Sequence, residues 1–272
     1  MRLVDSHCHL QADRFAADVD ALVERAREAG VERILVPGWN AESSRAALDL
    51  VARHSWLDAS AGVHPHDAAA VDAAGWREIE TMARDPWVVA IGETGLDFDR
   101  AFSPPAAQVE NLRRNLALAL ETGKPAILHC RSKAGVRDAQ DTLLLELVRA
   151  GFGSDAVVAA FGARPAAVIH SFSGPVDYAR DMLALGLAIS FSGLVFRRGE
   201  EASADVARIV PTERLLVETD APYLSPPGAP RQRNEPEWVR LTADWAAAQR
   251  DEPGDALGAS LVANYEAVFG RC

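Results

Sequence analysis

Cysteine is scarce in this sequence, which contains only Cys8, Cys130 and Cys272 among its 272 residues. Three scattered cysteines are too few for a disulfide framework, and their spacing does not match a zinc site built from thiolates. The scarcity of cysteine indicates a protein of a reducing compartment, and we expect it in the cytoplasm.

Long apolar runs and an excess of basic residues are also missing. No stretch of eighteen apolar residues is present to span a membrane, and no basic, apolar leader of the secretory kind is visible. Acidic residues outnumber basic ones by 39 to 28, which gives a formal net charge of −11. This balance argues against a broad basic face for nucleic acid. We expect any nucleic acid binding to be weak and to involve few nucleotides, and we expect no membrane partner.

Short apolar runs alternate with helical patterns along the whole chain. The runs are rich in Val, Ile and Leu, as expected of strands covered on both faces. They predict strands over Arg2–Asp5, Arg33–Pro37, Leu57–Val63, Val88–Ile91, Ala126–His129, Ala167–His170, Leu187–Ser190 and Leu215–Glu218. The intervening patterns predict helices over Asp18–Ala29, Ala41–Arg53, Ala74–Arg84, Pro105–Thr122, Ala139–Ala150, Val176–Leu185, Glu200–Ile209 and Glu235–Gln249.

Eight alternations without a polar linker or a change of composition favour one closed (β/α)8 barrel of the TIM type. We therefore expect residues 1–272 to form a single α/β domain, with Asp255–Phe269 as an extra C-terminal helix. The connection from Gly151 to Arg164 is long for such a barrel. A doubly wound open sheet is the alternative, but no Gly-x-Gly-x-x-Gly motif follows the first strand.

Six of the seven histidines lie where a predicted strand ends, and only His54 does not. Glu93 follows the fourth predicted strand and Asp220 follows the eighth. The carboxyl ends of the strands build the active site of a (β/α)8 barrel. We therefore expect one site that combines these acids with His7, His9, His64, His66, His129 and His170.

This set of side chains is typical of a metal site. His7 and His9 are two residues apart in an extended segment, so both imidazoles point to one face and can reach one ion. The histidines and carboxylates together exceed what one tetrahedral ion needs, so we predict two divalent ions that share a carboxylate. Glu93 is central among the strand ends and is the best candidate bridge. Mixed nitrogen and oxygen ligands admit zinc, magnesium or manganese.

Two further residues are candidates for substrate binding. Arg131 shares a strand face with His129, so we expect it to point into the same mouth, where a guanidinium can hold a phosphate through two hydrogen bonds. His64 is a candidate to steady the phosphate or to protonate the leaving oxygen. Each also has a structural interpretation, Arg131 as a member of an ion pair and His64 as a loop residue beside Pro65.

These motifs resemble those of the TatD family of metal-dependent deoxyribonucleases, within the amidohydrolase-like barrels. The matching stretches follow the family's order over nearly the whole chain: Asp5-Ser6-His7-Cys8-His9-Leu10, Gly62-Val63-His64-Pro65-His66, Ile91-Gly92-Glu93-Thr94-Gly95-Leu96-Asp97-Phe98, His129-Cys130-Arg131, His170-Ser171-Phe172-Ser173-Gly174, Glu218-Thr219-Asp220-Ala221-Pro222-Tyr223-Leu224 and Arg233-Asn234-Glu235-Pro236. The sequence departs from the family at Ala221, where serine is frequent, and in a longer segment after Arg131.

The resemblance implies a ligand set and a substrate class. One ion would be held by His7, His9, Glu93 and Asp220, and the second by Glu93, His129 and His170. DNA ends are the implied substrate. The departures from the family pattern lie around the substrate rather than the metal ions.

We therefore expect a monomeric two-metal hydrolase that cleaves phosphodiester bonds, a DNA exonuclease or deoxyribonuclease. Metal ions would activate the attacking water, with Asp220 as general base and Glu93 as the shared ligand. The alternative is a metal-dependent amidohydrolase or aminoacyl-tRNA deacylase, because the same metal pair suits an ester or amide carbonyl. A barrel that binds metal without turnover is a third interpretation, but such a protein should have lost a ligand, and none is missing.

Overall fold

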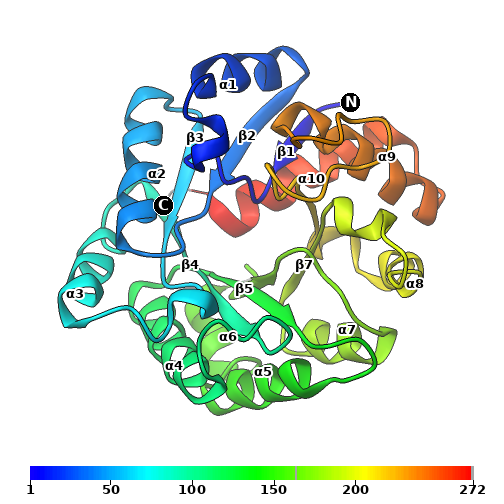
Figure 1. Cartoon of the computed structure of the whole chain (residues 1–272). Helices are drawn as coiled ribbons and strands as arrows, with labels where there is room; N and C mark the ends of the chain where they lie inside the picture. Colours follow the sequence, from blue (N-terminus) through cyan, green and yellow to red (C-terminus); the bar gives the residue numbers. More distant parts are fainter. Residues whose placement is uncertain (163, 271–272) are drawn as a thin grey trace.

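Eight parallel strands wrap into a barrel that helices surround in the computed structural model of the chain (Figure 1). The structure describes residues 1–162 and 164–270, so Cys272 lies outside the described residues. The strands follow one another around the barrel in chain order. They are β1 (Leu3–Asp5), β2 (Val31–Val36), β3 (Leu57–Ala61), β4 (Val88–Asp97), β5 (Ala126–Arg131), β6 (Ala167–Ile169), β7 (Ala188–Phe191) and β8 (Leu215–Val217).

Backbone hydrogen bonds between the ends of β1 and β8 close the barrel. The amide of Ser6 donates to the carbonyl of Val217 at 3.1 Å, and the amide of Asp220 donates to the carbonyl of His7 at 2.9 Å. The predicted barrel is thereby confirmed over the open sheet. The closure also brings the segments that carry His7 and Asp220 side by side.

The helices are amphipathic and cover the outside of the strands. Those of the described residues are α1 (Val19–Glu28), α2 (Ala41–Arg53), α3 (Ala73–Met82), α4 (Pro105–Thr122), α5 (Asp138–Arg149), α6 (Asp155–Phe161), α7 (Val176–Ala184), α8 (Ala202–Ile209), α9 (Val239–Arg250) and α10 (Gly254–Phe269). Short 3-10 turns join them: η1 (Asp13–Phe15), η2 (Pro65–Asp67), η3 (Gly193–Phe196), η4 (Thr212–Arg214) and η5 (Pro236–Trp238). Among the described helices, none is long and apolar enough to cross a bilayer.

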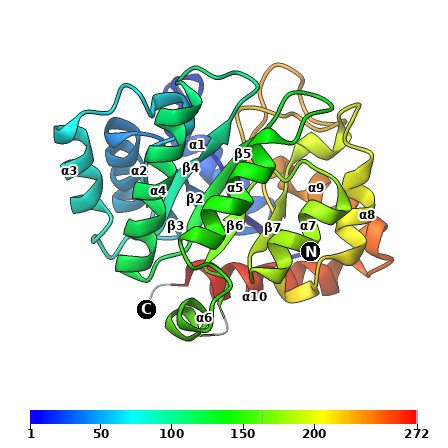
Figure 2. The same cartoon turned by 90° about the horizontal axis from the view of Figure 1, so that it is seen from below.

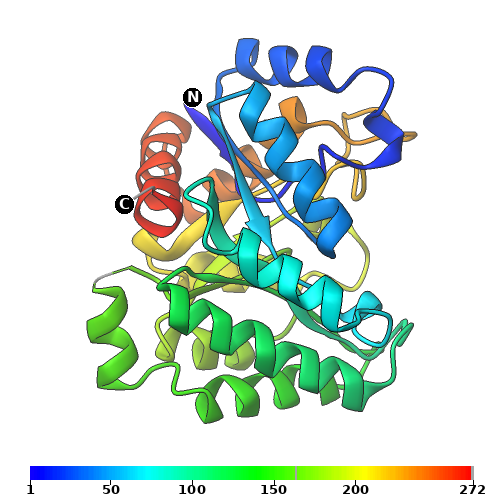
Figure 3. The same cartoon turned by 90° about the vertical axis from the view of Figure 1, so that its left-hand side faces the viewer.

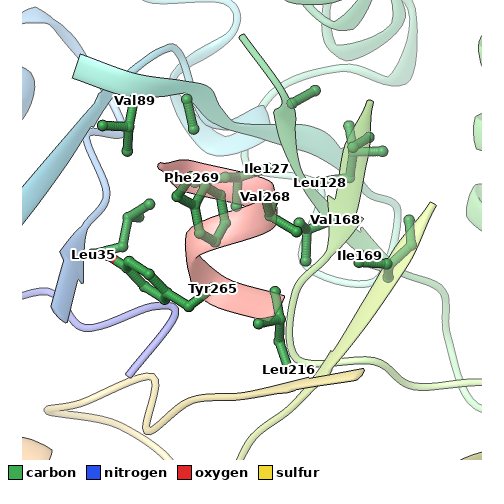
Figure 4. Close-up of a cluster of buried hydrophobic side chains, with 14 of the residues drawn as sticks. Leu35, Val89, Ile127, Leu128, Val168, Ile169, Leu216, Tyr265, Val268 and Phe269 are labelled. Atoms are coloured by element: carbon green, nitrogen blue, oxygen red, sulfur yellow. The ribbon is translucent and has the colours of Figure 1, made fainter. Parts of the chain in front are cut away.

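The predicted extra C-terminal helix, α10, covers the amino-terminal end of the barrel (Figures 2 and 3). Its buried Tyr265, Val268 and Phe269 point among strand side chains that include Leu35 and Leu216 (Figure 4). The Tyr265 hydroxyl also donates to the buried carboxylate of Asp58 at 2.9 Å. With this end filled, the carboxyl ends of the strands form the open mouth of the barrel.

The strand β4 is longer than the sequence predicts, because it continues from Ile91 to Asp97. Gly92 and Gly95 explain the difference, since a Cβ atom at either position would collide with backbone atoms of β5. The absence of side chains lets the two strands approach closely, and their pairing resumes from Thr94 to Asp97 after a register shift. Glu93 projects from the irregular stretch between Ile91 and Thr94, where its amide donates to the carbonyl of Gly38 in the loop after β2.

The long connection after α5 contains the short helix α6, which we did not predict. Ser154 caps this helix, because its hydroxyl accepts a hydrogen bond from the amide of Val157. Figure 2 shows α6 beyond the end of α5, at the same end of the barrel as α10. The connection therefore lies away from the mouth of the barrel.

Candidate metal centre

One group of candidate ligands gathers where β1 and β8 end. The Nε2 atoms of His7 and His9 are 3.2 Å apart. His9 Nε2 is 3.3 Å from Asp220 Oδ1, and His7 Nε2 is 3.2 Å from Glu93 Oε2. Two histidines and two carboxylates therefore direct four ligand atoms toward one another.

A second group of ligands surrounds the other oxygen of Glu93. Its Oε1 atom lies 2.9 Å from His170 Nε2, 3.1 Å from His129 Nδ1 and 3.2 Å from His64 Nε2. His129 Nδ1 and His170 Nε2 are themselves 3.2 Å apart. One buried carboxylate thus presents a separate oxygen to each of two groups of imidazoles.

These distances fit divalent cations. Ligand atoms about 2.1 Å from a tetrahedral ion are separated from one another by about 3.4 Å. The nitrogen–nitrogen and nitrogen–oxygen distances in both groups lie near that value. Nitrogen lone pairs that face each other also repel unless a proton or a cation lies between them. The donor set therefore fits metal ions.

Electrostatics set the charge of the central carboxylate and of one imidazole beside it. Burial alone would raise the pKa of Glu93, but the imidazoles of His170, His64 and His7 hold it well below its usual value, so the carboxylate is charged. Burial lowers the pKa of His64 to about 4. The His64 imidazole is therefore neutral near pH 7. Its Nδ1 accepts a hydrogen bond from the His66 amide at 3.1 Å, so its proton lies on Nε2, which faces Glu93 Oε1.

Two buried carboxylates support the histidines from behind. Glu218 Oε1 lies 3.1 Å from His170 Nδ1 and accepts a hydrogen bond from the Ser171 amide at 2.7 Å. Asp97 Oδ2 lies 2.8 Å from His66 Nε2 and 3.5 Å from His129 Nε2. A carboxylate on the far nitrogen of a ligating histidine fixes the tautomer and the orientation of the ring.

Replacing Glu218 with glutamine is expected to weaken metal binding at the His129–His170 group by about 10- to 100-fold, because the amide no longer supplies the charge that orients His170. A competition titration with a chromophoric chelator measures this affinity. Glu200→Gln is a suitable control, since Glu200 accepts a hydrogen bond from the Ser173 hydroxyl in a neighbouring loop. Equal affinities for Glu218→Gln and the unsubstituted protein would contradict the supporting role.

The structure brings together all six predicted ligands, His7, His9, Glu93, His129, His170 and Asp220. His64, which we expected to contact substrate, lies within the same cluster, where its Nε2–H faces Glu93 Oε1. Its position at the end of a strand is the signal that the sequence offered. The supporting roles of Glu218 and Asp97 were missed, because the sequence does not tell which histidine a carboxylate faces.

We expected Arg131 to point toward the metal ligands, but its side chain points elsewhere. Its side chain is 48% exposed, and its Nε donates to Asp99 Oδ2 at 3.0 Å. Asp97 pairs with Arg131 across the neighbouring strands, so Asp99 in the next loop lies within reach of the guanidinium. The structural interpretation as an ion pair describes this conformation, and contact with substrate stays a prediction.

Comparisons with known proteins agree with this geometry. The family model described as TatD related DNase matches residues 4–270. The chain is 37% identical to the 3'-5' ssDNA/RNA exonuclease TatD of Erwinia amylovora, over 98% of this chain and 100% of that protein. It is 39% identical to the protein of the same name from Yersinia pseudotuberculosis, over 98% and 99% of the two chains.

Solved structures show the same relationship. A TatD homologue from Escherichia coli superposes with a TM-score of 0.85 at 30% identity, over 98% of each chain. A TatD family hydrolase from Entamoeba histolytica has a TM-score of 0.86 at 20% identity, over 100% and 99% of the two chains, and shows the shared fold. The resemblance predicted from the motifs is therefore confirmed, and this chain belongs to the TatD-related DNase family.

Proposed function

We propose that this protein is a two-metal nuclease that hydrolyses phosphodiester bonds at the ends of nucleic acid strands. The observation that carries the proposal is Glu93, whose two oxygens face two separate groups of imidazoles. The relatives that are named ssDNA/RNA exonucleases support a phosphodiester substrate over the ester or amide alternative.

The residues divide into two proposed sites. His7, His9, Asp220 and Glu93 would hold one ion, and Glu93, His129 and His170 would hold the other. Divalent ions in such sites neutralise the charge on a phosphoryl group and lower the pKa of water. A zinc, magnesium or manganese pair is compatible with these ligands.

Asp220 is the residue that we assign as general base. Its side chain is 15% exposed, whereas that of Glu93 is 3% exposed, so Asp220 is the carboxylate that can exchange protons with solvent. Burial raises its pKa, but the nearby His9 and His7 bring the pKa below its usual value. Asp220 is therefore unprotonated near pH 7 and ready to take the proton of the attacking water.

Basic side chains on the loops around the mouth support an anionic substrate. Within the described part of the chain, several exposed ones form no ion pair: Arg100, Lys133, Arg197, Arg198 and Arg231. They belong to the loops after β4, β5, β7 and β8, on a protein that is acidic overall. A few local cations suit contact with few phosphates, as the predicted short footprint requires. Arg131 would join them if substrate displaced Asp99.

Removing the metal ions is expected to abolish hydrolysis of a single-stranded oligonucleotide, because the buried ligands would then lack the cations that neutralise the phosphate. Metal-stripped protein is assayed before and after zinc, magnesium or manganese is restored, one ion at a time. Ester and amide substrates are assayed in parallel with the oligonucleotide. Full activity of the stripped protein, or faster cleavage of the ester or amide, would overturn the proposal.

A monomer in the cytoplasm is part of the same proposal. All candidate ligands come from one chain, and Cys8 and Cys130 are free thiols, which is usual in a reducing compartment. Light scattering of the active protein tests the monomeric state, and a dimer mass at assay concentration would contradict it.

A further inference from the structure

Two exposed aromatic side chains lie beside the metal centre, one next to each group of ligands. Tyr223 is 52% exposed, and its ring centroid is 5.8 Å from that of His9. Phe102 is 69% exposed, and its ring centroid is 4.7 Å from that of His66, which contacts Asp97 beside the second group. Such exposure shows that neither ring is needed to fill the core.

The loop that carries Phe102 is firmly anchored. The hydroxyl of Ser103 donates to the carbonyl of His66 at 2.7 Å and accepts from the amide of Ala69 at 3.0 Å. The buried side chain of Gln108 donates to the carbonyl of Ser103 at 2.8 Å. Phe102 is therefore presented to solvent by a fixed backbone next to the site.

The segment around Tyr223 is equally constrained. The residues Asp220 and Leu224 on either side of it have positive φ angles of 54° and 51°. The carbonyl of Pro222 accepts hydrogen bonds from the Asn234 amide and from Arg14 Nη1, at 3.2 and 3.4 Å. The backbone is thus held in an unfavourable conformation that turns Tyr223 outward.

We propose that Phe102 and Tyr223 stack on unpaired bases to either side of the scissile phosphate and thereby select single-stranded ends. This inference rests on the proposed nuclease function. Aromatic rings bind bases through their π faces regardless of sequence, whereas bases in a duplex are already stacked on one another. With the phosphate at the metal centre, the neighbouring bases lie within reach of the two flanking rings.

The experiment compares Phe102→Ala and Tyr223→Ala with the aromatic replacements Phe102→Trp and Tyr223→Phe and with the aliphatic replacement Phe102→Leu. The substrates are a short single-stranded oligothymidylate and the same backbone with abasic residues at the cleaved end. In each alanine variant, the ratio of kcat/KM for the base-bearing substrate to that for the abasic substrate should fall about tenfold, mainly through KM. The aromatic replacements should keep the ratio of the unsubstituted protein.

Val158→Ala is the matched control, because Val158 is 53% exposed on α6 at the opposite end of the barrel. An unchanged ratio in both alanine variants would overturn the stacking proposal. The proposal would also be overturned if Phe102→Leu kept the ratio of the unsubstituted protein as well as Phe102→Trp does. If the unsubstituted protein cleaves both substrates in these cases, the nuclease function stands and only the stacking proposal fails. If it cleaves neither substrate, both proposals fail.

Discussion

Glu93→Ala is expected to lower kcat/KM for an oligonucleotide by about 1,000-fold or more, even with excess metal present. The substitution removes the carboxylate whose two oxygens face the two groups of imidazoles, so fewer than two ions should remain bound. Metal ions supply several kcal/mol of charge stabilisation to a reacting phosphate. Each 1.36 kcal/mol lost from the barrier corresponds to about a tenfold change in rate.

Steady-state kinetics and metal analysis of the purified variant measure both effects. Glu146→Ala is a matched control, because Glu146 is also 3% exposed but pairs with Arg113 and Arg149 on the outer helices. The control should keep both ions and its turnover. Near-normal hydrolysis by Glu93→Ala after metal is restored would rule out the shared-carboxylate mechanism.

Phe269→Ala is expected to lower the free energy of unfolding by about 3–5 kcal/mol. Phe269 is 1% exposed and packs with Tyr265 inside the amino-terminal end of the barrel (Figure 4). Truncation leaves a cavity among strand side chains that belong to several β-strands, which cannot move together to fill it. Denaturant unfolding followed by tryptophan fluorescence measures the loss.

Glu266→Gln, on the exposed side of the same helix, should change the free energy of unfolding by less than about 0.5 kcal/mol. Below the unfolding transition, Phe269→Ala should keep its metal content, because the ligands lie at the other end of the barrel. A loss of less than about 1 kcal/mol in Phe269→Ala would show that α10 is not needed to close the barrel.

The two predictions separate the two ends of the barrel. In (β/α)8 barrels, the carboxyl ends of the strands carry the chemistry and the amino ends contribute to stability. Here the acids and histidines of the mouth are buried polar groups. Burying such groups costs free energy, which their contacts with one another only offset. The apolar residues of α10 provide packing at the end where no ligand is present.

The sequence alone was enough to determine the strand–helix alternation, the extra C-terminal helix and the six candidate metal ligands that the structure brings together. Alternation and helix ends depend on patterns that are local in the chain. The ligands could be predicted because parallel strands of a barrel place their carboxyl ends together, so His7, Glu93 and Asp220 meet although they are far apart in the chain. The family resemblance follows from the same motifs.

Only the tertiary structure decided which atoms face one another. Strand register and barrel closure set distances of about 3 Å between groups from different strands, and no local pattern encodes them. For this reason the sequence did not reveal that His64 faces Glu93, that Glu218 supports His170, or that Arg131 turns to Asp99. The exposure of Phe102 likewise depends on loop anchors formed by residues that are distant in the chain.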